Sequence, residues 1–216
     1  VQTLVKREKP RAEILLLDEC HRGLNATNQQ ILAWYPDALS LGLTATPWRL
    51  DGRGLGSMYE TIVAPLTARE AVDQGYLLPL RIYEPDRPDL KGIGRTGGDY
   101  NQKQLHQRMG ENPKRIGSIV ENYLEFGEQQ RAAVFPTGVE DSRDIVRKFV
   151  EAGIAAEHLD GTMNDGQREA VLARFERGET RVVSSVDVIT EGFDLPSLGC
   201  IILARPTLSL TRFLQM

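Results

Sequence analysis

The sequence predicts an α/β fold built from parallel β-sheets with helices packed on their faces. One observation is the apolar run from Ile14 to Leu17, which does not alternate with polar residues and is typical of a strand covered on both faces. The other is the regular alternation of strand-like and helix-like segments after residue 113, which predicts parallel strands joined by crossover helices. Ligands of such sheets bind at the carboxyl ends of the strands.

Three further elements follow the first strand. Residues 25–35 begin with polar residues and continue with an apolar cluster, which favours a short helix returning to a second strand at 39–43. A glycine-rich stretch then predicts a loop. Thr67 is predicted to cap a helix reciprocally with Glu70, and Gly75 to end that helix.

Residues 80–112 are predicted to form a connector. The segment is rich in proline and glycine and poor in aliphatic residues, with one short helix expected at 102–108. Its string Gly-Ile-Gly-Arg-Thr-Gly, at 92–97, matches the fingerprint of dinucleotide-binding loops. Loop-like residues flank the string on both sides, so the strand and helix that such a site requires are not predicted there, and the context excludes it.

The second half of the chain repeats the strand–helix unit. The predicted helices are 116–126, 139–150 and 165–177, and the predicted strands are 131–135, 155–159, 181–185 and 198–204. This order predicts one parallel sheet between two helical layers. Functional residues are therefore expected on the loops that follow the strands.

The composition limits the classes of function. The chain has 216 residues, of which 41% are hydrophobic, enough for a packed core. A formal net charge of −4 gives no overall basic field, although local grooves can still hold nucleic-acid phosphates. Two cysteines are too few for a disulfide framework, and the sequence shows neither a long apolar stretch nor a leader-like segment. We expect a cytoplasmic protein without membrane spans.

The tip of the first strand carries the clearest chemistry. Asp18 and Glu19 follow the apolar run directly, and Cys20 and His21 come next. Adjacent carboxylates at a strand end suit nucleotide hydrolysis, with Asp18 holding Mg2+ through water and Glu19 orienting the attacking water. Two alternatives stay open. The acidic pair could merely open a helix, or Asp18, Glu19 and His21 could be the ligands of a metalloenzyme. Cys20 is interpreted as a packing residue.

Three motifs in order give the sequence a family resemblance. They are Asp18-Glu19-Cys20-His21, Thr44-Ala45-Thr46 and Thr190-Glu191-Gly192-Phe193-Asp194. This set resembles motifs II, III and V of superfamily 2 helicases and translocases, in the DExH variant. Within the superfamily it is most similar to the RadD-like branch, akin to the helicase parts of type III restriction subunits. The resemblance implies an incomplete first RecA-like lobe at 1–79, a connector at 80–112 and a truncated second lobe at 113–216.

The resemblance also implies roles for individual residues. His21 would bond the hydroxyls of Thr44 and Thr46, so that these three act with Asp18 and Glu19 and link hydrolysis to lobe movement. Residues implied to face the nucleotide are Gly192, Asp194 and Gln215, and residues implied to touch nucleic acid are Thr137, Thr190 and Arg49. Capping hydroxyls explain Thr137 and Thr190 equally well, and Arg49 could be a solvated loop residue. His106 is interpreted as a surface residue and His158 as a hydrogen-bonded strand residue.

The activity implied by the resemblance is ATP-dependent helicase or translocase action. ATP and Mg2+ would be the cofactors and nucleic acid the partner, with DNA favoured over RNA and any fused or associated nuclease or repair partner left open. The phosphate-binding loop is expected upstream of Val1 and the motif VI arginines after Met216, so this fragment alone should be nearly inactive. The alternatives are a nucleic-acid-stimulated ATPase that remodels complexes without unwinding, and a noncatalytic nucleic-acid-binding scaffold.

Overall fold

The computed structural model describes residues 9–22, 26–47, 54–84, 87–112, 114–189 and 195–216. The chain divides into two compact units, Val1–Arg81 and Ile82–Met216, and each is described by itself. Within the described ranges, the structure contains no helix that is long and apolar enough to cross a membrane.

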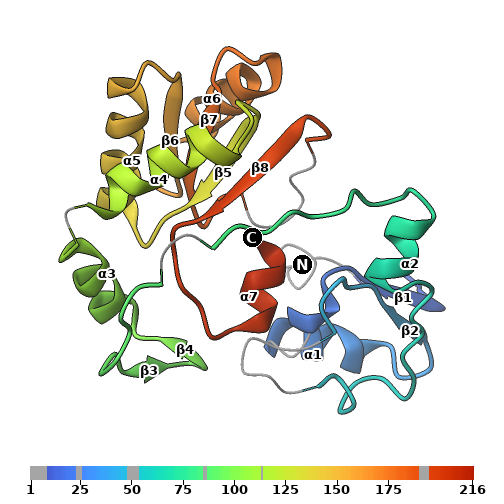
Figure 1. The fold of residues 1–216 in the computed structure, drawn as a ribbon. Helices are drawn as coiled ribbons and strands as arrows, with labels where there is room; N and C mark the ends of the chain where they lie inside the picture. The colour runs from blue at the N-terminus through green and yellow to red at the C-terminus, as the bar shows by residue number, and fades with distance from the viewer. Residues whose placement is uncertain (1–8, 23–25, 48–53, 85–86, 113, 190–194) are drawn as a thin grey trace. The chain divides into compact units, whose positions relative to one another are not determined.

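The first unit contains two parallel strands. Helix α1 (Ala26–Trp34) joins β1 (Ile14–Leu17) to β2 (Leu39–Gly42), so both strands end at the same edge (Figure 1). A 3-10 turn, Cys20–Arg22, follows β1, and helix α2 (Ala68–Asp73) comes later. The predicted reciprocal cap of α2 is present, because the side chains of Thr67 and Glu70 each accept the other residue's backbone N–H.

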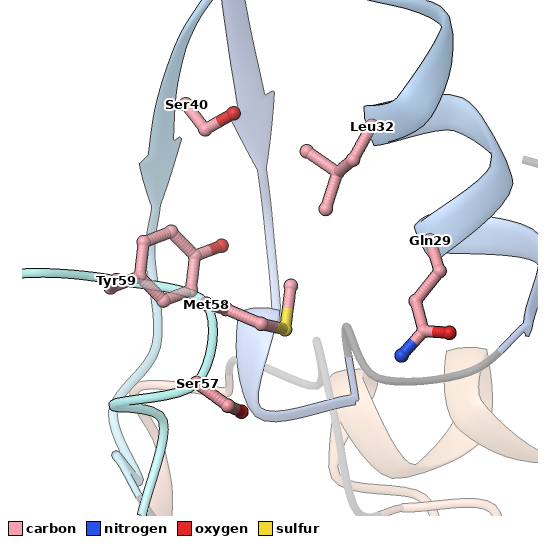
Figure 2. A pocket seen from close by; sticks show the side chains of 6 residues that line it. All are labelled: Gln29, Leu32, Ser40, Ser57, Met58 and Tyr59. Carbon is pink, nitrogen blue, oxygen red and sulfur yellow. The ribbon is translucent and has the colours of Figure 1, made fainter. Parts of the chain in front are cut away.

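The apolar run at 14–17 predicts that the first strand is buried on both faces, and this prediction is wrong. Ile14 and Leu16 are 59% and 66% exposed, and Leu39 and Leu41, their neighbours on β2, are exposed as well. The opposite face of the strand pair carries Ser40, which points toward α1 (Figure 2). The described residues therefore cover one face of this sheet and leave the other open.

The second unit is built on a four-stranded parallel sheet with the order β6-β7-β5-β8 (Figure 1). Its strands are β5 (Arg131–Phe135), β6 (Ala156–Asp160), β7 (Val182–Val186) and β8 (Leu198–Leu203). The helices that connect or flank them are α4 (Arg115–Phe126), α5 (Val139–Glu151), α6 (Asp165–Arg177) and α7 (Leu210–Gln215). The sequence predicts all of these except α7, and β6 and β7 each begin one residue later than predicted.

Strand β5 is buried on both faces. Ala132 and Val134 lie in one apolar cluster with Phe149 of α5, whereas Ala133 lies in a second cluster with Phe175 of α6. All five side chains are fully buried, so the sheet lies between two helical layers as predicted. This packing fixes the strand ends, and the loops that follow them start from rigid positions.

The connector is more ordered than the sequence predicts. Strands β3 (Arg95–Thr96) and β4 (Asp99–Tyr100) form an antiparallel hairpin, and helix α3 (Gln102–Gly110) follows it. Gly97 and Gly98 have φ angles of 61° and 87°, and a two-residue hairpin turn of this kind requires positive φ. The dinucleotide-like string therefore runs into a hairpin turn.

Candidate functional site

The first unit brings two strand ends together. Asp18 and Glu19 follow β1, and Thr44 and Thr46 follow β2. Backbone hydrogen bonds continue past the strands, from the N–H of Leu43 to the carbonyl of Leu17 (2.9 Å) and from that of Cys20 to the carbonyl of Leu43 (3.0 Å). The two acidic and the two hydroxyl residues are therefore held side by side at the carboxyl edge.

The imidazole of His21 joins these strand ends. Its Nδ1 lies 3.0 Å from Oγ1 of Thr44, 3.4 Å from Oγ1 of Thr46 and 3.2 Å from Oε2 of Glu19. His21 is 5% exposed and Thr46 is 3% exposed, so the cluster is screened from water. The ring thus bridges a carboxylate on one strand end and two hydroxyls on the next.

The hydrogen bonds of Thr44 define which form of His21 makes this bridge. The single Thr44 hydroxyl proton is donated to the carbonyl oxygen of Thr46 (3.2 Å), and Oγ1 accepts the N–H of Thr46 (3.1 Å). Thr44 Oγ1 can then only accept from His21, and a carboxylate such as Glu19 also only accepts. The tautomer of His21 that carries a proton on Nδ1 suits this arrangement, because that nitrogen faces acceptor oxygens.

Glu19 has an unusual backbone conformation. Its φ is 49°, in the left-handed region, which costs about 1 kcal/mol or more for a residue with a side chain. The Glu19 side chain is 39% exposed, so this turn directs a carboxylate to the edge of the site while His21 stays buried. Strain of this kind is typical of functional positions.

Asp18 is exposed and fits a role in holding a divalent cation through water. Its Oδ1 accepts the N–H of Glu19 (2.9 Å), which fixes the carboxylate at the strand tip. Mg2+ in nucleotide sites is typically held by one or two carboxylates together with water and substrate phosphates, so few protein ligands are needed. A complete protein-built metal centre is absent from the described residues, which hold no group of three or more His, Cys, Asp or Glu side chains in range. Asp18, Glu19 and His21 do not form such a group.

Cys20 and Tyr59 pack beneath these strand ends. Cys20 is 3% exposed, in agreement with its predicted packing role, and burial raises the pKa of its thiol. Burial also raises the pKa of Tyr59 to about 12, so both groups stay neutral. A cavity of about 350 Å³ adjoins Tyr59, between α1 and β2 (Figure 2). Its lining residues are Gln29, Leu32, Ser40, Ser57, Met58 and Tyr59, and none of them is a predicted site residue.

The second unit also presents polar residues at its strand ends. Thr137 follows β5, Asp160 ends β6, Asp187 follows β7 and Arg205 follows β8. Because all four strands are parallel, these residues share the carboxyl edge of the sheet. Asp187, like Glu19, has a left-handed backbone, with φ 54°.

Thr137 is buried and engaged within the protein. Its hydroxyl donates to Oδ2 of Asp141 (2.9 Å), and that oxygen also accepts the Thr137 N–H (2.9 Å). Nδ1 of His106 lies 3.1 Å from the same hydroxyl, so the half-exposed His106 does more than face solvent. These contacts favour a local structural role, but the hydroxyl does not cap α5, whose N-cap is Gly138 without a side-chain cap bond.

Asp160 lies in a buried hydrogen-bonded chain. Its Oδ2 is 2.8 Å from Nε2 of His158, whose Nδ1 is 2.6 Å from Oγ of Ser142, and Ser142 contacts Ser184. The order of groups is that of a serine hydrolase, but Ser142 is 0% exposed and no substrate could reach it. The prediction that His158 is a hydrogen-bonded strand residue is confirmed.

Four of the predicted site residues, Arg49, Thr190, Gly192 and Asp194, lie outside the described residues. Gln215 ends helix α7, and Asp18, Glu19, His21, Thr44, Thr46 and Thr137 take the positions given above. Nothing in the sequence pattern marks Asp99 or Arg205 as a buried charge, because connector and post-strand residues give no periodic signal. The Gly-Gly pair before Asp99 could have revealed the hairpin.

Two segments of the chain match protein families. Residues 115–216 match the family described as Helicase conserved C-terminal domain. Residues 2–49 match the family described as Type III restriction enzyme, res subunit. The second match contains the whole His21 cluster, and the first contains the sheet of the second unit.

Relatives align along nearly the whole chain. A 51.5 kDa protein of a Lactococcus phage (isolate 7-9) is 34% identical over 202 residues, covering 94% of this chain and 44% of the phage protein. A Saccharomyces cerevisiae protein whose name gives it as a candidate ATP-dependent helicase, IRC3, is 26% identical, covering 100% of this chain and 33% of its own length. The type I restriction enzyme EcoAI endonuclease subunit of Escherichia coli is 23% identical, covering 94% and 29%. The chain thus spans less than half the length of these relatives.

Among solved structures, a Saccharomyces cerevisiae Dbp5 variant bound to RNA and ADP BeF3 gives a TM-score of 0.51 at 14% identity. The match covers 94% of this chain and 47% of that one. A likeness at this level of identity concerns the fold alone. The predicted α/β class with RecA-like units is confirmed.

Proposed function

We propose that this chain, whose segments match the families described as Helicase conserved C-terminal domain and Type III restriction enzyme, res subunit, forms part of an ATP-dependent translocase or helicase acting on DNA. ATP is the nucleotide, and magnesium the cation, in this proposal. The preference for DNA over RNA rests on the restriction-enzyme relatives, because the RNA-bound structure shares only its fold with this chain.

One observation carries the proposal. Nδ1 of His21 lies within hydrogen-bonding distance of both Glu19, at the end of β1, and Thr44, at the end of β2. Phosphoryl transfer depends on positioning and on charge neutralisation rather than on covalent chemistry with the protein. A carboxylate held in a fixed position relative to a neighbouring strand end is suited to positioning the attacking water. The His21 hydrogen bonds would also couple the state of the nucleotide to β2.

The roles of the first unit follow from this geometry. Asp18, exposed at the strand tip, would hold the cation through water, and the cation would neutralise charge on the phosphates. Glu19 orients and polarises the attacking water, while His21 fixes the Glu19 carboxylate from behind. Thr44 and Thr46 contact the same Nδ1 of His21, and through it they would transmit changes at the site to β2.

Residues outside the His21 cluster would also bind nucleotide and nucleic acid. We assign Gly192, Asp194 and Gln215 to the nucleotide, and Arg49, Thr137 and Thr190 to nucleic acid. For Thr137, whose hydroxyl is already engaged by Asp141, the backbone at the start of α5 is the better candidate for contact with a phosphate.

The test is phosphate release by the full-length protein with magnesium and ATP. It is measured alone and with single-stranded DNA, duplex DNA or RNA, beside Glu19→Gln and the matched control Glu13→Gln. Glu13 is exposed and precedes the same strand at its other end. We expect DNA to stimulate hydrolysis, Glu19→Gln to reduce it about a hundredfold or more, and the control to match the wild type.

Strand-displacement and nucleic-acid-binding measurements beside this assay separate the competing functions. Hydrolysis without strand displacement on a duplex substrate would identify an ATPase that remodels complexes without unwinding. Nucleic-acid binding without hydrolysis by the wild-type protein would overturn the proposal in favour of a noncatalytic scaffold. Stronger stimulation by RNA than by DNA would overturn the assignment of DNA as the substrate, but would leave the proposed ATP-dependent translocase activity intact.

A further inference from the structure

Asp99, in strand β4 of the connector hairpin, is bonded to the segment that leads into helix α7. Asp99 is 7% exposed. Its Oδ1 accepts two backbone N–H groups, that of Leu208 and that of the adjacent residue Tyr100, both at 2.8 Å. Its Oδ2 accepts the hydroxyl of Thr207 (2.9 Å) and lies 3.6 Å from Nη1 of Arg212. One carboxylate thus holds three residues far along the chain.

Thr207 passes this constraint to the start of α7. Its hydroxyl donates to Asp99 and accepts the N–H of Ser209 (3.1 Å). Ser209, 6% exposed, is the N-cap of α7, and its hydroxyl accepts the N–H of Arg212 (3.3 Å). Asp99 is therefore linked through Thr207 to the N-cap of α7, whose hydrogen bond stabilises the first turn of the helix.

Asp99 also balances positive charge. Arg205 is 8% exposed, its guanidinium donates to Gln102, and its Nη1 lies 3.6 Å from Oδ1 of Asp187. Burial, and then the nearby Arg212, lower the pKa of Arg205, whereas Asp187 and Asp99 act in the opposite direction. Without the Asp99 charge, two guanidinium groups would face each other with less compensation.

We propose that Asp99 is a positioning residue for ATP hydrolysis, which holds residues 207–212 and thereby the first turn of helix α7. This inference rests on the proposed function. It gives the connector hairpin a role in the activity of the second unit. Asp99 contacts none of the reacting groups and acts through α7.

The substitution Asp99→Asn isolates this role. An amide keeps one oxygen for the N–H groups of Leu208 and Tyr100, but turns an NH2 group and no charge toward Thr207 and Arg212. The hairpin can therefore still form while the hold on α7 weakens. Asp89→Asn is the matched control, because Asp89 is an exposed carboxylate of the same connector and its Oδ1 accepts the N–H of Lys91 (3.0 Å).

Steady-state ATP hydrolysis of the full-length protein with saturating nucleic acid is the first readout. We expect Asp99→Asn to lower kcat about tenfold with KM for ATP changed by less than about twofold, because positioning acts on the reacting state. Thr207→Val should lower kcat in the same direction, and Thr207→Ser, which keeps the hydroxyl, should restore most of it. Equal kcat for Asp99→Asn and Asp89→Asn, with active wild-type protein, would overturn the proposal.

Amide hydrogen exchange, measured without nucleotide, is the second readout. Asp99→Asn should speed exchange at Leu208 and Ser209 about tenfold relative to Asp89→Asn, because the bonds that protect these amides weaken. Unchanged exchange would overturn the proposal whatever the activity. Absence of hydrolysis by the wild-type protein would count against the proposed function instead, and the exchange result would still decide whether Asp99 holds the segment.

Discussion

Nδ1 of His21 lies 3.0 Å from Oγ1 of Thr44, across the ends of two neighbouring parallel strands. The same nitrogen lies 3.2 Å from Oε2 of Glu19. A displacement of one strand end relative to the other must therefore lengthen a hydrogen bond made by this ring. The arrangement gives the acidic pair a mechanical connection to β2 that does not depend on the nucleotide itself.

Removal of the Thr44 hydroxyl should slow hydrolysis. Thr44→Val keeps the shape of the side chain but takes away the acceptor for His21 and for the Thr46 N–H. We expect kcat for ATP to fall about tenfold, because Glu19 loses part of its fixed support. Thr44→Ser should remain close to the wild type, and Thr61→Val, at an exposed threonine, serves as control. Wild-type kcat in Thr44→Val would show that the link is not used.

Gly42 lets the side chains of Tyr59 and Cys20 pack closely against the backbone of the first unit. A Cβ at this position would lie 2.5 Å from the Cζ and hydroxyl of Tyr59 and 2.7 Å from Sγ of Cys20. We predict that Gly42→Ala lowers the free energy of unfolding by about 1–3 kcal/mol, since the tightly packed neighbours must move. Urea-induced unfolding measures the change. Gly56→Ala, whose Cβ would meet nothing within 4 Å, should change it by less than about 0.5 kcal/mol.

Much of the second unit could be predicted because its signals are local. The strand 131–135 and the helix 165–177 have the predicted bounds, since apolar spacing, a capping Asn164 and a left-handed Gly178 all lie within a few residues of each other. The tip of β1 could be predicted for the same reason. Its acidic pair stands directly after the apolar run, and the histidine that orients it follows within the same turn.

Long-range contacts explain what the sequence did not predict. Asp99 acquires its importance from Thr207 and Leu208, far along the chain, and a single aspartate after two glycines gives no sign of such partners. The exposure of Ile14 likewise depends on which elements cover the sheet, and an apolar run carries no information about that. Thr137 shows the same limit, because its engagement by Asp141 and His106 arises only once α3 and α5 pack.

Stability should depend on pH through Asp160. Hydrogen bonds from Thr162, and then from His158, hold the pKa of this buried carboxyl well below its usual range. A depressed folded-state pKa means that the stabilisation is fully present above the unfolded pKa of about 4, and is lost as pH falls toward the folded value. Asp160→Asn should therefore cost about 1–3 kcal/mol at neutral pH and progressively less below pH of about 4.

Urea-induced unfolding at a series of pH values checks the Asp160 prediction. Asp144→Asn, at a partly exposed carboxylate paired with Arg147, is the control and should show a small effect at every pH. A difference between wild type and Asp160→Asn that stays constant down to acid pH would mean that packing, not charge, explains the contribution of Asp160.

Arg115 should be among the most sensitive positions of the second unit. Its guanidinium pairs with Asp141 and donates to the carbonyl oxygens of Met109 (3.2 Å) and Ala204 (3.4 Å), and the side chains of the pair are only 12% and 3% exposed. Arg115→Met would leave the Asp141 carboxylate buried without its cation, at a cost of about 3 kcal/mol or more in the free energy of unfolding. The matched control is Arg147→Met, because Arg147 is 62% exposed and its ion pairs contribute less than about 1 kcal/mol. Urea-induced unfolding of both variants decides the matter: equal losses would show that the buried pair contributes no more than a surface one, and that Asp141 is satisfied by Thr137 alone.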